Sequence, residues 1–357
     1  MVKRRHCLEI LVGLIACCCS ASSQARTFLY VSLAADNGLA VYEVNEATGK
    51  LQYLRLHELG TDPGPMSVSA DRKTIYVALR NAGKLASFTV SADDGLLKHL
   101  TTVTVDPDPA YHWPDVKGRY LLSAYYRTGK VALHRLDARG AILAANPKWY
   151  STARNAHGIA VDKENRRVYV THTGANAIYQ FELNASASSL EPAARPVIRT
   201  PEKTGPRHIA LHPNKPFAYA DNEQGNSITF FRIEKGNLQA VQTLSTVPDD
   251  WDQGGACARL EMSADGRYVY VANRGHNSIA SFRIDQQSGR LTSLGQVPTE
   301  ANPRSFAIHQ NGRFLYAGGQ DTDRLAIFSR ATDGRLKRIG TVQSGKRPWW
   351  LQLVTIP

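Results

Sequence analysis

The feature that most constrains this chain is a short apolar strand pattern that recurs seven times. Clear copies run from Ile75 to Leu79 and from Val269 to Asn273, and each copy contains one anchor residue. The anchors, spaced 46 to 51 positions apart, are Tyr30, Tyr76, Leu122, Tyr169, Tyr219, Tyr270 and Tyr316. A repeat of this length, made of short strands between turns, is typical of a propeller blade. We therefore predict an all-β, seven-bladed β-propeller.

The ends of the chain indicate how the ring closes. The first repeat begins at its anchor strand and lacks the strand that precedes it, whereas Pro348 to Val354 form a spare strand of that kind. The C-terminal strand should join the N-terminal blade, which removes the open sheet edges. Residues 26–357 are thus expected to form one domain. The longest insertion, Asn184 to Thr204, is rich in Ala, Ser and Pro, and it is expected to be a surface loop.

Residues 1–25 have the pattern of a signal peptide. Basic residues at positions 3–5 precede an apolar stretch from Leu8 to Ala21, and small residues, Ser23 and Ala25, precede the expected cut. We predict a periplasmic or secreted protein with no integral membrane span after removal of this segment. Two alternatives are a short membrane anchor and a lipoprotein anchored through Cys17, which ends a lipobox-like sequence.

The cysteine content and the net charge of the chain indicate which reactive groups and which partners to expect. Four of the five cysteines lie in residues 1–25, which leaves Cys257 without a partner for an intrachain disulfide. A buried structural cysteine is favoured there over a nucleophile, since no basic residue stands beside it. The net charge of +12 favours anionic partners. No run of five basic residues or nucleic-acid motif is present, so no nucleic-acid partner is expected.

Two columns of residues come into register when the repeats are aligned on their anchors. Because the strand before each anchor is antiparallel to the anchor strand, the start of one and the end of the other lie on one face of the propeller. Twelve positions before the anchors lie Gly64, Ala110, His157, Arg207, Ala258 and Arg304, with Trp349 in the last strand; four positions after them lie Ala34, Arg80, Tyr126, Thr173, Glu223, Arg274 and Gln320. Both columns should surround one mouth of the central channel.

The chemistry of this mouth points to an anionic ligand. Four arginines, one carboxylate and one imidazole come together there, and guanidinium groups match the geometry of carboxylates and phosphates. The carboxylate and the imidazole could transfer protons at such a ligand. The alternative is a set of exposed rim charges. No cofactor and no metal are expected, since His208, His212, His276 and His309 do not share a column and no zinc or calcium pattern is present.

At these residues the chain resembles a known family. The segments Gly205–Pro213, Asp265–Phe282 and Asn302–Gln320 are similar to the propeller-type lactonases, and the resemblance extends from Phe28 to Leu353. It implies catalytic roles for four residues that the register also selects: His157, Arg207, Glu223 and Arg274. The register adds four candidates for substrate binding: Arg304, Arg80, Gln320 and Tyr126.

The resemblance implies a lactone hydrolase, like the propeller form of 6-phosphogluconolactonase, that acts on a phosphorylated or carboxylated sugar-type lactone. The partner is then a small anionic lactone, and we expect a monomer. Two other functions stay open. The same residues could catalyse a carboxy-muconate-type cycloisomerisation, or the chain could be a non-enzymatic envelope propeller that binds an anionic ligand or a protein.

Overall fold

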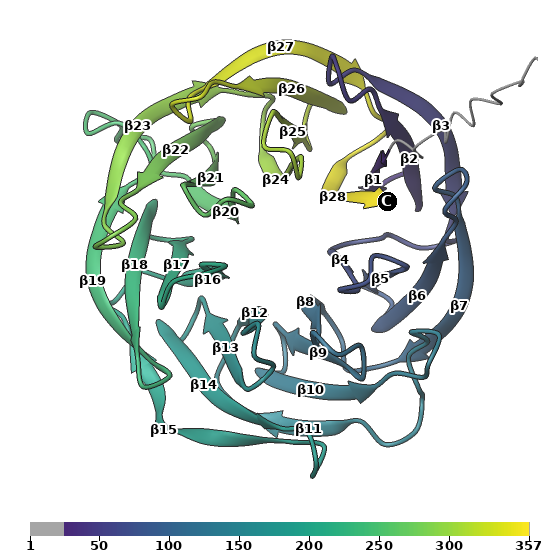
Figure 1. Cartoon of the computed structure of the whole chain (residues 1–357), viewed down its shortest axis with the longest axis vertical. Coiled ribbons are helices and arrows are strands. Elements are labelled where there is room, and N and C mark those ends of the chain that lie inside the picture. Colours follow the sequence, from purple (N-terminus) through teal and green to yellow (C-terminus); the bar gives the residue numbers. More distant parts are fainter. Residues whose placement is uncertain (1–24, 357) are drawn as a thin grey trace, which may run out of the picture.

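The computed structural model describes residues 25–356. Every regular element in that range is a β-strand, and the strands form seven sheets of four. The sheets stand around a common axis as the blades of a propeller (Figure 1). The predicted all-β, seven-bladed β-propeller is therefore confirmed.

Each blade runs from an innermost strand beside the axis to an outer strand at the rim (Figure 1). The first three blades, from inside to outside, are β28 (Pro348–Ile356), β1 (Arg26–Leu33), β2 (Gly38–Val44) and β3 (Leu51–Glu58); β4 (Met66–Val68), β5 (Thr74–Leu79), β6 (Lys84–Val90) and β7 (Leu97–Thr104); and β8 (Pro109–Pro114), β9 (Tyr120–Tyr125), β10 (Lys130–Arg135) and β11 (Lys148–Ser151).

The other four blades repeat this order. They are β12 (Ala156–Val161), β13 (Arg167–His172), β14 (Ala177–Asn184) and β15 (Ser189–Arg199); β16 (Pro206–Leu211), β17 (Phe217–Asn222), β18 (Ser227–Glu234) and β19 (Asn237–Ser245); β20 (Ala256–Met262), β21 (Tyr268–Arg274), β22 (Ser278–Ile284) and β23 (Leu291–Pro298); and β24 (Pro303–Ile308), β25 (Phe314–Gly319), β26 (Arg324–Arg330) and β27 (Leu336–Gln343).

The ring closes as the ends of the chain predict. Strand β28 pairs antiparallel with β1, from Arg26 opposite Ile356 to Leu33 opposite Pro348. The first blade therefore combines the two ends of the described chain, and β28 provides the innermost strand that precedes β1 in the sheet. Apolar side chains from neighbouring blades pack together, as in the cluster that joins Phe28, Met66 and Trp350.

Five of the six anchor tyrosines connect their blade to the next. Each of these five hydroxyls donates a hydrogen bond to a glycine carbonyl in the turn before the outer strand of the following blade. The pairs, at oxygen–oxygen distances of 2.6 to 3.0 Å, are Tyr30 with Gly95, Tyr169 with Gly236, Tyr219 with Gly289, Tyr270 with Gly334 and Tyr316 with Gly49. The turn needs glycine. At Gly95 φ is +69°, and an added Cβ would lie 2.4 Å from the ring of Phe28. The repeated tyrosine therefore marks a contact between two blades as well as the position of a strand.

The insertion expected to be a loop contributes a strand instead. Residues Ser189–Arg199 form β15, which pairs with β14 at the outer edge of the fourth blade. That position tolerates its composition, because an edge strand leaves one row of backbone groups unpaired in the sheet and can contain proline. Pro192 lies opposite Phe181, beside an irregularity in the pairing.

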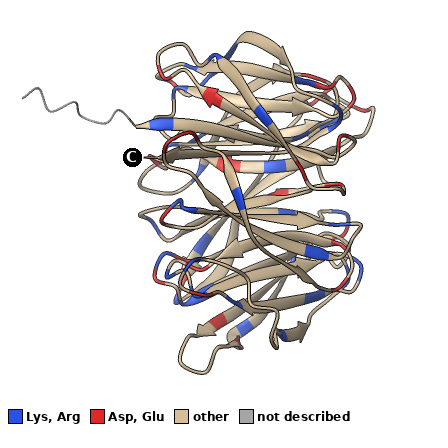
Figure 2. Ribbon diagram, turned by 90° about the vertical axis from the view of Figure 1, so that its right-hand side faces the viewer, with Lys and Arg blue, Asp and Glu red and all other residues tan. Residues whose placement is uncertain are grey.

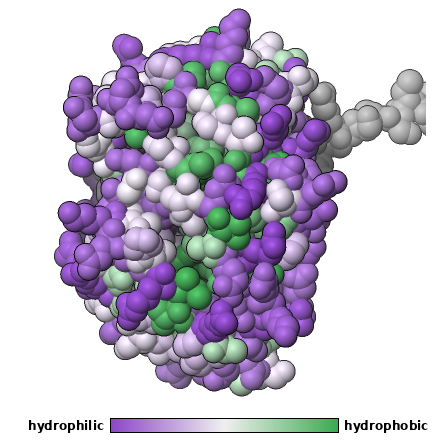
Figure 3. Space-filling view, turned by 90° about the vertical axis from the view of Figure 1, so that its left-hand side faces the viewer, coloured by the Kyte–Doolittle hydropathy of each residue, from purple (hydrophilic) through white to green (hydrophobic). Residues whose placement is uncertain are grey.

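Charged residues of both signs occupy the turns at the two faces of the ring (Figure 2). The side that carries the outer strands β19 and β23 is mostly hydrophilic, with hydrophobic residues in separate patches (Figure 3). Among residues 25–356 no helix is long and apolar enough to cross a membrane. The predicted signal peptide, Cys17 included, lies outside the described residues except at its last position.

Candidate functional site

The candidate site is built by β-bulges in the innermost strands. The pairing of β12 shifts between Ala156 and Ile159, and that of β16 shifts between Pro206 and Ile209. Strands β20 and β24 shift at the equivalent place. A bulge breaks the strict alternation of side chains along a strand and re-aims the residues within it. Two successive residues of one strand can therefore both reach the channel.

Arg207 and His208 are such a pair. Nη1 of Arg207 lies 3.1 Å from Nδ1 of His208, and both side chains are buried. The peptide that joins them leaves the strand ladder, and side chains satisfy both of its polar groups. Thr171 on β13 donates its hydroxyl to the Arg207 carbonyl at 2.5 Å, and Oδ1 of Asp221 accepts the His208 N–H at 2.7 Å.

The same threonine supports the neighbouring bulge. Its hydroxyl oxygen accepts the N–H of Gly158 at 2.9 Å, so Thr171 links the backbone beside His157 to the backbone of Arg207. Glycine is required at this contact, because a Cβ on Gly158 would lie 2.4 Å from the Arg207 carbonyl oxygen. The relative position of two candidate catalytic residues thus depends on one hydroxyl and one glycine.

Glu223 lies between two arginines. Its Oε1 is 3.6 Å from Nε of Arg207 and forms a second ion pair with Nη2 of Arg274. Arg274 also donates to the Cys257 carbonyl at 3.0 Å. Burial raises the pKa of the Glu223 carboxyl, but Arg207 and Arg274 outweigh it, so the net pKa falls below the ordinary glutamate value. The carboxylate stays charged and 21% exposed.

Arg304 and Arg80 share the ring of Trp349. Their guanidinium carbons lie 4.7 and 5.6 Å from its centre. Arg80 is paired with Asp108, whereas Arg304 forms no ion pair with any acid in the described chain. Burial, and then repulsion by the other arginines, lowers the pKa of Arg304 well below its usual range. This repulsion is relieved when an anion binds between the arginines.

His157 is buried and uncharged. Burial, and then the charge of Arg207, lowers its pKa well below the ordinary histidine value. Its Nδ1 has no hydrogen-bond partner in the described chain. The ring meets those of Tyr126 and His208 edge to face, at centroid distances of 5.9 and 5.0 Å.

The structure therefore brings together seven of the eight residues selected from the sequence, and we call them the arginine cluster: Arg80, Tyr126, His157, Arg207, Glu223, Arg274 and Arg304. Gln320 is buried, and its backbone N–H bonds to the Asn302 carbonyl at 3.3 Å. None of its described contacts joins it to the arginines. Within residues 25–356 no group of three or more His, Cys, Asp or Glu residues could hold a metal ion.

A comparison with known families assigns the fold. Residues 28–353 match the family described as Lactonase, 7-bladed beta-propeller. The chain belongs to this family. The match covers nearly all of the described residues, and it confirms the resemblance found in the sequence.

Individual relatives of the family cover most of the chain. The 6-phosphogluconolactonase of Cronobacter sakazakii is 28% identical over 309 residues, which are 86% of this chain and 92% of the relative. The 6-phosphogluconolactonase of Enterobacter sp. is 27% identical over 335 residues, 93% of this chain and 97% of the relative. The solved structure of the Pseudomonas aeruginosa periplasmic gluconolactonase matches with a TM-score of 0.87 at 24% identity, over 94% of this chain and all of that one.

One feature of this lactonase-family propeller was missed in the sequence: a layer of side chains packed together in the channel below the arginine cluster. We call Tyr111, His208, Arg259 and Trp350 the central layer. Tyr111 lies 5.4 Å from His208 and 5.3 Å from Trp350 between ring centroids. Arg259 stacks on Trp350 at 3.8 Å. The repeat register could have found them, because each lies one position after a member of the first column.

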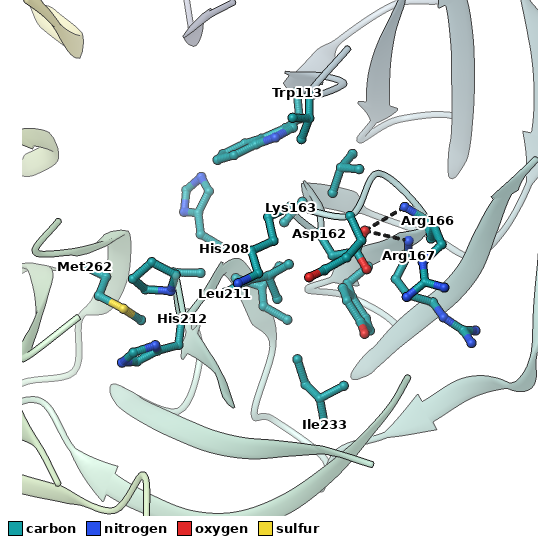
Figure 4. A pocket seen from close by; sticks show the side chains of 18 of the residues that line it. Trp113, Asp162, Lys163, Arg166, Arg167, His208, Leu211, His212, Ile233 and Met262 are labelled. Atoms are coloured by element: carbon teal, nitrogen blue, oxygen red, sulfur yellow. Dashed lines mark hydrogen bonds between the residues drawn. The ribbon is translucent and has the colours of Figure 1, made fainter. Parts of the chain in front are cut away.

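A large cavity lined by described residues lies on the other side of this layer. It has a volume of about 1070 Å³ and reaches the turns between the first and second strands of the blades. We call it the opposite-face cavity (Figure 4). Its lining includes His208, Arg259 and Tyr111, but no residue of the arginine cluster. His208 therefore belongs to both environments: it contacts His157 on one side and lines the cavity on the other.

Proposed function

We propose that this chain hydrolyses a small lactone that carries a phosphate or carboxylate group, with the arginine cluster as its active site. The observation that supports it best is the charge of the cluster. Four arginines face three carboxylates, Glu223, Asp108 and the buried Asp221, so positive charges outnumber negative ones around this site. Arg304, which has no acid partner in the described chain, is the natural contact for the anionic group of the substrate.

In the proposed reaction, water adds to the lactone carbonyl and the ring C–O bond then breaks. Arg207 and Arg274 stabilise the negative charge that develops on the carbonyl oxygen. Glu223 and His157 transfer the protons: one of them accepts a proton from the attacking water, and that proton then passes to the ring oxygen as it leaves. The product is a hydroxy acid, which releases one proton to solution at neutral pH.

The bound substrate also adjusts these two groups. Burial and then the charge of Arg207 lower the pKa of His157, whereas the arginines alone lower the pKa of Glu223. An anionic substrate offsets part of that positive field and raises both pKa values toward neutrality. Proton transfer is then favoured when the correct substrate is in place, which supports an anionic lactone over a neutral one.

The test is a proton-release assay on 6-phosphogluconolactone, gluconolactone and a carboxylated muconolactone, corrected for spontaneous hydrolysis. Replacing the base is expected to reduce kcat by about 10²- to 10⁴-fold in Glu223→Gln or His157→Ala. Arg304→Gln should raise KM for the phosphorylated lactone by about 10- to 100-fold and leave gluconolactone nearly unchanged. Wild-type rates in both Glu223→Gln and His157→Ala would refute the assignment.

A labelled-water experiment separates hydrolysis from cycloisomerisation. Hydrolysis in H₂¹⁸O places one solvent oxygen in the product, whereas cycloisomerisation leaves the composition of the substrate unchanged. No turnover on any lactone would favour the non-enzymatic binding function.

We further propose that the protein acts outside the cytoplasm, as one domain of residues 26–357. The signal-like residues 1–25 support this, as does the likeness to a periplasmic gluconolactonase. Mass spectrometry of protein from the cell envelope should find a chain that begins at Arg26. A lipid-modified Cys17 at the N-terminus would instead establish the lipoprotein alternative.

A further inference from the structure

We propose that the opposite-face cavity is a second binding site, specific for a small aromatic anion such as an aryl carboxylate or sulfonate. Its volume of about 1070 Å³ is at the upper end of the range for small-molecule sites. The central layer separates it from the arginine cluster, so its ligand is distinct from the proposed lactone.

The walls of the cavity are apolar and open to water. Trp113, Leu211 and Met262 line it from three innermost strands, β8, β16 and β20, and are only partly buried. Val116 at its edge is 43% exposed. In Figure 4 the indole of Trp113 and the imidazole of His208 project into the same space. Accessible apolar and aromatic side chains that converge in one hollow are typical of a ligand site.

The acids of the lining are largely occupied by contacts within the protein. Asp162 accepts the backbone N–H groups of Arg166 and Arg167 at 2.7 and 2.9 Å. Glu182 pairs with Arg167 at 2.6 Å, and Glu261 pairs with Arg259. Asp162 and Glu164 are the acids of the lining that form no ion pair in the described chain.

The lining contains more basic than acidic residues, and most of the basic side chains form no ion pair with the described residues. Lys163, Arg166, Lys215 and Lys235 form no ion pair with an acid in residues 25–356. They outnumber the two acids that are unpaired in this range, Asp162 and Glu164, by two, so the edge of the cavity carries an uncompensated positive charge. Apolar walls beneath a cationic edge fit a ligand whose flat body lies against Trp113 while its charged group meets the lysines.

The probe for this test is 8-anilinonaphthalene-1-sulfonate, an aromatic anion whose fluorescence rises in apolar surroundings. The purified protein should bind it at one saturable site. Displacement by 2-naphthoate should be about threefold to tenfold more effective than by naphthalene-2-carboxamide, its neutral analogue, because only the carboxylate meets the cationic edge. Equal displacement by the two compounds would overturn the anion specificity.

Three variants locate the site. Lys215→Glu should weaken probe binding by about threefold to tenfold. Lys50→Glu makes the same charge change at an exposed position outside the lining, so it should have little effect. Leu211→Asp, which puts a carboxylate on the apolar wall, should weaken binding further, and a thermal unfolding curve shows whether it is folded. If Leu211→Asp is unfolded, the lysine pair alone decides the test.

Arg304→Gln separates this site from the arginine cluster. Probe binding should survive in that variant, whatever its effect on lactone turnover. The proposal is refuted by three results: no saturable binding, equal effects of Lys215→Glu and Lys50→Glu, or loss of binding in Arg304→Gln alone. None of these outcomes depends on lactonase activity.

Discussion

The arginine cluster and the opposite-face cavity lie on two sides of the central layer and use different halves of the same innermost strands. On the cluster side the strands are bulged, and side chains such as Thr171 and Asp221 satisfy the released backbone groups. On the cavity side the pairing is regular, and side chains such as Leu211 and Met262 form apolar walls. The arginine cluster contains buried charges and depends on hydrogen bonds from neighbouring side chains, whereas the charged side chains of the opposite-face cavity lie at its solvent-exposed edge.

This difference shows how one repeat can provide two chemistries. A bulge shifts the alternation of side chains within a strand, so the residues before and after it follow different registers. The first half of a strand can then present buried cations, while the second half continues an ordinary apolar pattern. Variants on one side should therefore leave the other side unchanged.

The largest effect is expected from Arg207→Ala. This change removes a partner of Glu223 and a donor to the developing oxyanion, so kcat/KM for lactone hydrolysis should fall by about 10²- to 10³-fold. Fluorescence titration with 8-anilinonaphthalene-1-sulfonate should be unchanged. Loss of both lactone hydrolysis and probe binding, together with a lower Tm, would mean that the two regions are not independent.

The pH dependence of hydrolysis comes next. The Glu223 carboxylate and the neutral His157 ring are the forms that accept protons, and both groups have pKa values below their ordinary ones. As the pH falls, kcat/KM should stay constant to below 4.5, the ordinary pKa of glutamate, before it declines. Arg274→Gln removes one lowering charge and should move the decline to higher pH. A pH–rate profile that declines near pH 6.5 in the wild type would contradict this.

Thr171 tests the support of the cluster. Thr171→Val keeps the shape of the side chain but loses both hydrogen bonds of its hydroxyl, so kcat/KM should fall by about threefold to tenfold. Thr171→Ser keeps the hydroxyl and should restore most of the rate. Equal rates in the two variants would show that the shape of this side chain matters and its hydrogen bonds do not.

The smallest effect concerns the contacts between blades, which lie away from both regions. Tyr219→Phe removes a buried hydrogen bond to Gly289 and should lower the free energy of unfolding by about 1 kcal/mol. Tyr76→Phe is the matched control, because the buried Tyr76 hydroxyl has no partner in the described chain. Denaturant titration of the pair should show a loss in the first variant only, with lactone hydrolysis and probe binding unaffected in both.

Repetition made much of this molecule predictable from its sequence. The seven anchors, their spacing and the spare C-terminal strand determine the number of blades and the closure of the ring, because each repeat is a local unit that needs a neighbour to bury its faces. The two columns placed seven of eight candidate residues in one cluster. The position of a residue along its strand is enough to place it at one face of the propeller, and no contact between distant residues has to be known.

Tertiary structure decided what register cannot express. The bulges aim Arg207 and His208 at the same channel, and Thr171 links Arg207 to Gly158 from 36 positions away in the chain. The segment expected to be a loop became β15, since the outer edge of a sheet accepts proline. The central layer and the cavity behind it likewise depend on how side chains of separate blades fill one axis. The pattern of one repeat determines its own strands, but contacts between repeats determine what those strands enclose.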